Sequence, residues 1–232
     1  MSTWLGPEEW QAVALSLRVS LVATVLSLPL GLLAAYALAR WQFRGKALLN
    51  GLIHLPLVLP PVVTGYLLLL AFGRRGWIGG WLEESFGLVL AFRWTGAVLA
   101  AALMAFPLMV RAMRLALEAV DPRLEEAAST LGASRLWVFA TVTLPLILPG
   151  VIAGVVLAFA KAMGEFGATI TFVSNIPGQT QTVPSAIYAF LQVPDGETSA
   201  LRLVAVSVFV AMAALALSEI LARRVAGQVR SW

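Results

Sequence analysis

Five long apolar segments divide this chain, and they constrain its fold more than any other feature. They cover residues 13–39, 48–72, 95–113, 146–166 and 201–221. Each holds about 20 residues or more, enough for an α-helix to cross the roughly 30 Å hydrocarbon core of a bilayer. Only 12% of the chain is charged and 60% is hydrophobic, so the apolar excess must face lipid. We therefore expect an all-α integral membrane protein with about five transmembrane helices in one domain, 1–232.

The second segment is interrupted by Pro56, Pro60 and Pro61. Proline frees backbone groups of a helix, and lipid cannot satisfy them. We therefore predict a broken helix that faces protein or a water-filled path, with a simple kink packed inside the bundle as the alternative. Residues 183–193 are apolar but too short to span a membrane, so they predict an outer half-helix starting at Pro184.

Lysine and arginine residues are distributed unevenly around these segments. The stretches 40–46, 111–135 and 223–230 hold ten of them, against three between the second and third segments and none from 167 to 200. Because such residues gather on the cytoplasmic side, the N-terminus should lie outside and the C-terminus inside. The net charge of +4 then needs no nucleic-acid partner. We expect no cleaved secretory signal, since the first ten residues carry Glu8 and Glu9 and no basic residue.

The polar stretch 121–145 carries clear helix boundaries. Asp121 followed by Pro122 is typical of a helix start. Gly132 fits the left-handed position that stops a helix. Ser134 would cap a second helix, and Pro145 would end it. These signals predict a cytoplasmic two-helix elbow, a shape suited to docking into a cleft of another protein.

Lys161 and Glu165 are charged residues in the fourth segment, four positions apart and therefore on one helix face. Unpaired charges are costly in a membrane, so a structural salt bridge and the lining of a pore or gate are equal alternatives. The hydroxyls and amides that follow would suit a route for a hydrated anion, with ordinary loop polarity as the alternative. The candidate pathway or gate residues are Pro56, Pro60, Pro61, Lys161, Glu165, Thr169, Thr171, Ser174 and Asn175.

The sequence offers little for covalent chemistry. His54 is the only histidine, has no Cys, Asp or Glu nearby, and predicts a packing or hydrogen-bonding role rather than a metal site. Lys46 and Lys161 lack the glycines and the following hydroxyl of a phosphate-binding loop. We therefore expect no catalytic residue, no metal and no cofactor bound by this chain. An integral membrane enzyme and a purely structural scaffold are the alternatives from other classes.

The elbow resembles the EAA motif of ABC importer permeases. Glu126, Ala127 and Ala128 are followed at the motif's spacing by Gly132, Val142, Leu144 and Pro145, with Val142 in place of the usual Ile. The resemblance implies that the elbow couples this chain to a separate ATPase subunit. The residues that it assigns to this coupling are Glu126, Ala127, Ala128, Gly132, Leu144 and Pro145.

Residues 54–65, 73–76 and 164–178 are similar to the permeases of molybdate importers, and the resemblance covers about 9–224. It implies a type I ABC importer of the bacterial cytoplasmic (inner) membrane for a tetrahedral oxyanion, molybdate or tungstate. It also implies a homodimer of this chain, two ATPase subunits that bind ATP and Mg, and a periplasmic or lipid-anchored oxyanion-binding protein. Sulfate and thiosulfate permeases share the elbow and are the near alternative. Some relatives carry an extra N-terminal span, and we expect this chain to lack it.

Overall fold

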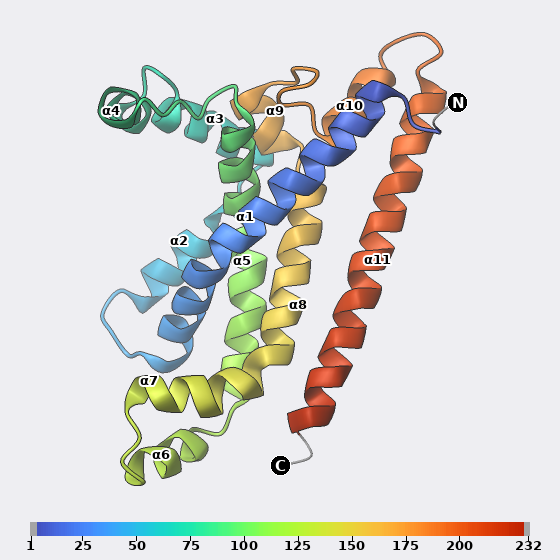
Figure 1. Ribbon diagram of the computed structural model, residues 1–232. Coiled ribbons are helices and arrows are strands. Elements are labelled where there is room, and N and C mark those ends of the chain that lie inside the picture. Colours follow the sequence, from blue (N-terminus) through green and yellow to red (C-terminus); the bar gives the residue numbers. More distant parts are fainter. Residues whose placement is uncertain (1–3, 230–232) are drawn as a thin grey trace.

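The computed structural model describes residues 4–229, and every regular element in that range is a helix (Figure 1). The helices are α1 Pro7–Arg40, α2 Lys46–Val58, α3 Pro61–Phe72, α4 Trp77–Phe86, α5 Trp94–Ala119, α6 Pro122–Thr130, α7 Arg135–Val138, the π-helix η1 Phe139–Thr143, α8 Leu144–Met163, α9 Gly167–Val173, α10 Val183–Phe190 and α11 Glu197–Val229. Arg230 of the basic tail lies outside the described residues.

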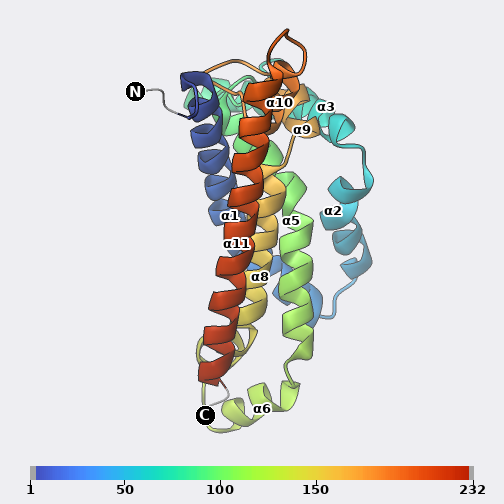
Figure 2. The same ribbon diagram turned by 90° about the vertical axis from the view of Figure 1, so that its right-hand side faces the viewer.

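The long helices run between two ends of an elongated bundle. In Figure 1, α1, α5 and α11 descend from the end that carries α9 and α10, whereas α8 rises from the end that carries α6 and α7. The start of α1 and the last turn of α11 therefore lie at opposite ends. Figure 2 shows α2 and α3 on the side of the bundle away from α1. This arrangement makes the odd number of crossings that the five apolar segments predict.

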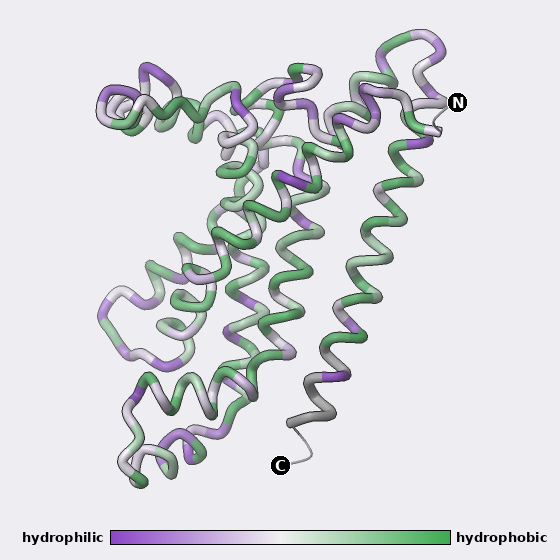
Figure 3. Tube along the Cα trace, in the orientation of Figure 1, coloured by the Kyte–Doolittle hydropathy of each residue, from purple (hydrophilic) through white to green (hydrophobic). Residues whose placement is uncertain are grey.

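Four helical segments are long and apolar enough to cross a membrane singly. They are Pro7–Arg40, Trp94–Ala119, Arg135–Met163 and Glu197–Leu221. The pair α2 and α3 passes the same test only together, and its two helices meet at an angle of 113°. The second segment is thus sharply broken, as its prolines predict. Figure 3 shows apolar residues along the long helices and polar residues concentrated at the two ends of the bundle.

The core lies where α5 packs between α1 and α8. Met109, Met113 and Leu117 follow one another at four-residue spacing on α5 and are fully buried. Small residues on the neighbouring helices allow this close packing. A Cβ at Gly31 of α1 would lie 2.8 Å from Sδ of Met109, and one at Gly154 of α8 would lie 3.1 Å from its carbonyl oxygen. The contact resembles those that small residues permit between membrane helices.

Several element boundaries differ from the sequence-based expectations. Helices α4 and α9 lie outside the five apolar segments, in stretches where the sequence indicated no helix. Helix α10 begins at Val183, with Pro184 as its second residue, and α11 begins at Glu197 rather than at 201. Helices as short as α4 and α9 contain too few residues for a clear apolar period, so glycine content and polarity obscured them.

Candidate functional site

The elbow has three of the four predicted helix boundaries. The carboxylate of Asp121 accepts a hydrogen bond from the backbone N–H of Arg123 at 3.0 Å, and Pro122 is the first residue of α6. Gly132 has a φ of +86° and follows the end of α6. The hydroxyl of Ser134 accepts a bond from the N–H of Trp137 at 3.4 Å. Two capped helices joined through a left-handed glycine therefore form the elbow.

The end of the second elbow helix was expected at Pro145, and this expectation is wrong. Helix α7 continues through η1 into α8, and Pro145 lies in the first turn of α8. The N–H of Leu144 bonds to the carbonyl oxygen of Phe139, five residues back, as in a π-helix. In Figure 1, α7 lies across the end of the bundle and α8 runs along it. Leu144 and Pro145 thus form the foot of a membrane helix rather than the end of the elbow.

Large apolar side chains are exposed around the turn of the elbow. Leu131 is 90% exposed, Leu136 82% and Trp137 64%. Ala128 and Gly132 share with Leu131 and Trp137 a shallow concavity of about 610 Å³. Apolar groups exposed together at the polar end of a membrane protein mark a contact with another protein.

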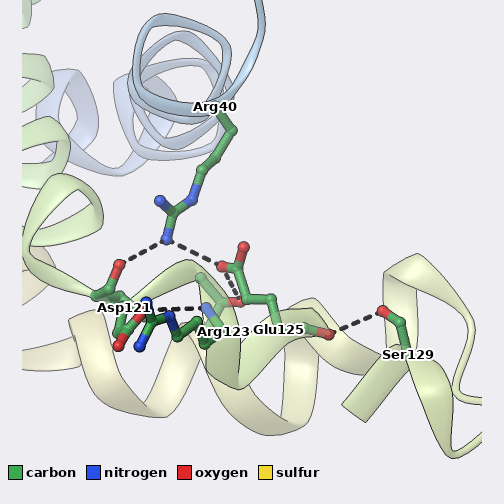
Figure 4. A network of polar contacts seen from close by, with 7 residues as sticks. Arg40, Asp121, Arg123, Glu125 and Ser129 are labelled. Atoms are coloured by element: carbon green, nitrogen blue, oxygen red, sulfur yellow. Dashed lines mark hydrogen bonds and ion pairs between the residues drawn. The ribbon is translucent and has the colours of Figure 1, made fainter. Parts of the chain in front are cut away.

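Glu125, rather than its neighbour Glu126, ties the elbow to the bundle (Figure 4). The guanidinium of Arg40, at the end of α1, donates to the Glu125 carboxylate at 3.2 Å and to the carbonyl oxygen of Val120 at 3.1 Å. The hydroxyl of Thr143 in η1 donates to the same carboxylate oxygen at 2.8 Å. The side chains of Arg40 and Glu125 are only 15% and 19% exposed, whereas Glu126 is exposed. One carboxylate therefore joins the ends of α1, α6 and η1.

This network was missed by the sequence analysis. Arg40 and Glu125 lie 85 positions apart, so no local pattern links them. The only available signal was an arginine directly after an apolar segment, on the same predicted side of the membrane as two adjacent carboxylates. Ala127 and Glu126 are both exposed and therefore lie on the outer surface of the elbow.

Lys161 and Glu165 form a salt bridge of 2.7 Å. Helix α8 ends at Met163, so Glu165 lies in the break before α9 rather than on a face of α8, which corrects the predicted placement. The second carboxylate oxygen of Glu165 accepts from the N–H of Ala168 at 3.0 Å. The Glu165 side chain is 1% exposed and that of Lys161 is 30% exposed. The salt bridge therefore fixes the α8–α9 break, and the ammonium group of Lys161 remains partly exposed.

The polar residues after Glu165 differ in how their polar groups are occupied. The hydroxyl of Thr169 donates to the carbonyl oxygen of Phe166 at 2.9 Å, and that of Thr171 donates to Gly167 at the same distance. Ser174 ends α9 with a φ of +66°. The Oδ1 atom of Asn175 is buried, and within residues 4–229 it has no hydrogen-bond partner. Asn175 thus has a free polar group, whereas the two threonines use theirs within their own helical turn.

The break between α2 and α3 lies against the start of α9. A Cβ at Gly167 would fall 2.6 Å from Cβ of Pro61, and one at Gly65 of α3 would collide with the backbone of Ala168. Pro60 and Pro61 are exposed, while Pro56 is buried within α2. The structure thus brings the Pro60–Pro61 break and the Glu165 segment together and leaves Pro56 inside a helix.

His54 and the acidic residues show no metal site. The Nδ1 atom of His54 lies 2.8 Å from the carbonyl oxygen of Asn50, within hydrogen-bond distance. Within residues 4–229, no three His, Cys, Asp or Glu side chains lie close enough together to hold a metal ion.

Residues 27–227 match the family model described as "Binding-protein-dependent transport system inner membrane component". The molybdenum transport system permease protein ModB of Escherichia coli K12 is 63% identical over 219 residues, which cover 94% of this chain and 96% of that protein. ModB of Haemophilus influenzae is 56% identical over 216 residues, 93% of this chain and 94% of its own. The sulfate transport system permease protein CysW of Synechococcus elongatus is 40% identical over 222 residues, 93% of this chain and 76% of its own.

Solved structures share the fold at low identity. A bacterial ABC transporter that imports the polysaccharide alginate matches with a TM-score of 0.71 at 17% identity, over 94% of this chain and 80% of that one. The MetNI methionine ABC transporter, in an inward-facing conformation, matches with a TM-score of 0.68 at 15% identity, over 94% of both chains. The all-helical architecture is therefore the one found in type I ABC importers.

Proposed function

We propose that this chain, which belongs to the family of binding-protein-dependent transport system inner membrane components, is the permease subunit of an ATP-driven molybdate importer. The assignment of molybdate as the substrate rests on the 63% identity over 94% of the chain with the molybdenum permease of Escherichia coli. Molybdate is a tetrahedral oxyanion, and tungstate belongs to the same class of shape and charge. The chain is a multi-pass membrane protein that moves its substrate without covalent chemistry.

The exposed elbow is the surface that would bind an ATPase subunit. Leu131, Leu136 and Trp137 offer large side chains of the kind that anchor protein interfaces. Glu126 and Ala127 are exposed on the same elbow and would extend the contact. ATP and Mg would be held by that partner, because this sequence carries no phosphate-binding loop. Two copies of this chain with two ATPase subunits, fed by a periplasmic or lipid-anchored binding protein, would complete the importer.

The Arg40–Glu125–Thr143 network would carry movement of the elbow into the bundle. Its carboxylate lies on α6, its cation at the end of α1, and its hydroxyl in the π-helical foot of α8. A shift of α6 that follows closure of the ATPase therefore displaces the ends of two membrane helices together. Sub-ångström shifts become discrete rearrangements because packed helices do not deform continuously.

The substrate route would follow the break between α2 and α3, where it meets α9. Irregular backbone at membrane depth is tolerated where protein or water surrounds it, and transporters place their sites at such breaks. The Lys161–Glu165 pair, the unpartnered oxygen of Asn175 and a similarly unpartnered buried hydroxyl at Thr64 are polar groups near these elements. We assign the gate to this region.

Charge and fold both support one orientation in the membrane. The end that carries the elbow is the one that the ten lysine and arginine residues predict to be cytoplasmic. The start of α1 lies at the opposite end (Figure 1). We therefore place the N-terminus outside and the end of α11 in the cytoplasm of a bacterial inner membrane.

Sulfate is the second candidate substrate, because a sulfate permease is 40% identical over 222 residues. The two are separated by reconstituting the complete importer in vesicles and measuring ATPase activity with the binding protein loaded with molybdate, tungstate or sulfate. Stimulation by molybdate and tungstate, and not by sulfate, is expected. Stimulation by sulfate alone would replace the proposed substrate while leaving the permease function intact.

A further inference from the structure

A long apolar groove runs between α1 and α5. It has a volume of about 560 Å³, and its lining is apolar except for Ser27 and Thr95. Leu26 and Leu30 form its rim on α1, and each is 62% exposed. Nothing in the described chain fills the groove, so in a membrane it must be filled by something as apolar as its walls.

The size of the groove fits one acyl chain. Its lining on α5 runs from Trp94 to Phe106, which at 1.5 Å per residue is about 18 Å. One leaflet contributes about half of the roughly 30 Å hydrocarbon core of a bilayer, or about 15 Å. Helix α5 starts at the end of the bundle away from the elbow (Figure 1). The groove therefore covers the depth of the leaflet on that side.

A cation lies at the mouth of the groove. The guanidinium of Arg18 lies 3.9 Å from the centroid of the Trp94 ring, and that ring also lines the groove. Arg18 is one helical turn before Val22, the first groove residue on α1, so both occupy the same face. Tryptophan at a helix start is typical of the headgroup region, and stacking fixes the direction of the guanidinium there.

No acidic group neutralises this mouth. Neither Arg18 nor Arg93 belongs to an ion pair among the side chains that the structure describes. Arg93 is exposed and directly precedes Trp94. The two unpaired cations match the phosphate of an anionic phospholipid. The apolar groove below them matches the length of one of its acyl chains. We propose that this groove binds such a lipid, with its phosphate on Arg18 and one acyl chain between α1 and α5.

The test is native mass spectrometry of the full chain, with the subunits that co-purify, in an equimolar mixture of dioleoylphosphatidylglycerol and dioleoylphosphatidylcholine. We expect the wild type to retain more phosphatidylglycerol than phosphatidylcholine. Removal of one interfacial cation in Arg18→Gln should lower this ratio about fivefold. The matched control is Arg75→Gln, because Arg75 is also exposed at this end but lies in the α3–α4 connection. It should leave the ratio unchanged.

A second variant tests the groove itself. Ala102→Phe places a ring among the lining residues and should reduce the retention of both lipids, whereas Leu21→Phe, on an exposed part of α1 outside the groove, should not. An unchanged lipid ratio in Arg18→Gln, or unchanged retention in Ala102→Phe, would overturn the proposal. It would also be overturned if Ala102→Phe converted a dimer into monomers while the wild type held no lipid, since the groove would then be a contact between two copies.

Discussion

Replacing Glu125 with glutamine tests whether the Arg40–Glu125 pair holds the elbow to the bundle. Glutamine keeps the shape of the side chain and can still accept a bond from Thr143. It removes the charge that faces the guanidinium of Arg40 at 3.2 Å. The adjacent Glu126 provides a matched control, because it has the same chemistry, lies one position along the same helix and is exposed.

The expected loss of stability follows from the burial of the pair. Hydrogen bonds to charged groups contribute about 1.5–3 kcal/mol, and exposed ion pairs contribute about 0–1 kcal/mol. With side chains 15% and 19% exposed, the pair is closer to the buried case. The Nε atom of Arg40 is buried and already lacks a partner, so the substitution would weaken the pairing of a guanidinium with one donor unsatisfied. We expect Glu125→Gln to cost about 2 kcal/mol of unfolding free energy and Glu126→Gln less than about 0.5 kcal/mol.

The assay is thermal unfolding of the purified chain in detergent, followed by tryptophan fluorescence. A loss of about 2 kcal/mol lowers the melting temperature by roughly 4–8 °C for a chain of this size. Arg40→Gln should have a similar effect, and the double variant Arg40→Gln, Glu125→Gln should lose little more than either single variant. Equal melting temperatures for the Glu125 and Glu126 variants would refute the reasoning, as would additive losses in the double variant.

Three further predictions concern the elbow and the broken helix. Gly132→Val should cost about 1–2 kcal/mol through its backbone alone, because no atom lies within 4 Å of the new Cβ. This variant should abolish co-purification of the ATPase or abolish uptake. Gly132→Asn should retain both, because asparagine tolerates a left-handed φ. Glu126→Lys should insert normally and lose ATPase binding or transport through its inverted charge, so wild-type uptake at equal expression would exclude this residue from coupling. Single cysteines at Val58 and Val63, beside the α2–α3 break, should react with a small soluble thiol reagent in at least one nucleotide state, whereas a cysteine at buried Met109 should not; no reaction at either position would remove the break from the route.

The elbow shows what local sequence could and could not predict. Its caps depend on contacts two or three residues apart, and the side chains of Asp121 and Ser134 make them as expected. The left-handed φ of Gly132 is likewise a property of one residue. The bond from Arg40 to Glu125 crosses 85 positions and exists only because α1 and α5 pack side by side and deliver their ends to the same place. No local pattern near either residue identifies the other as its partner.

Two proline sites explain why the same rule succeeded at one helix break and failed at another. The residue before a proline disfavours the helical region of φ and ψ. Leu59 and Pro60 are consecutive residues that each precede a proline. Both are extended, with ψ values of 142° and 133°, and α2 and α3 separate there. Leu144 also precedes a proline, yet it stays helical with a ψ of −45°. At that site only the backbone N–H of Pro145 is missing, and the wider π-turn gives room for the proline ring. The buried packing of Thr143 and Ile147 holds the segment helical. The single proline at the foot of α8 thus leaves the helical segment continuous, whereas the consecutive pair Pro60–Pro61 separates α2 from α3.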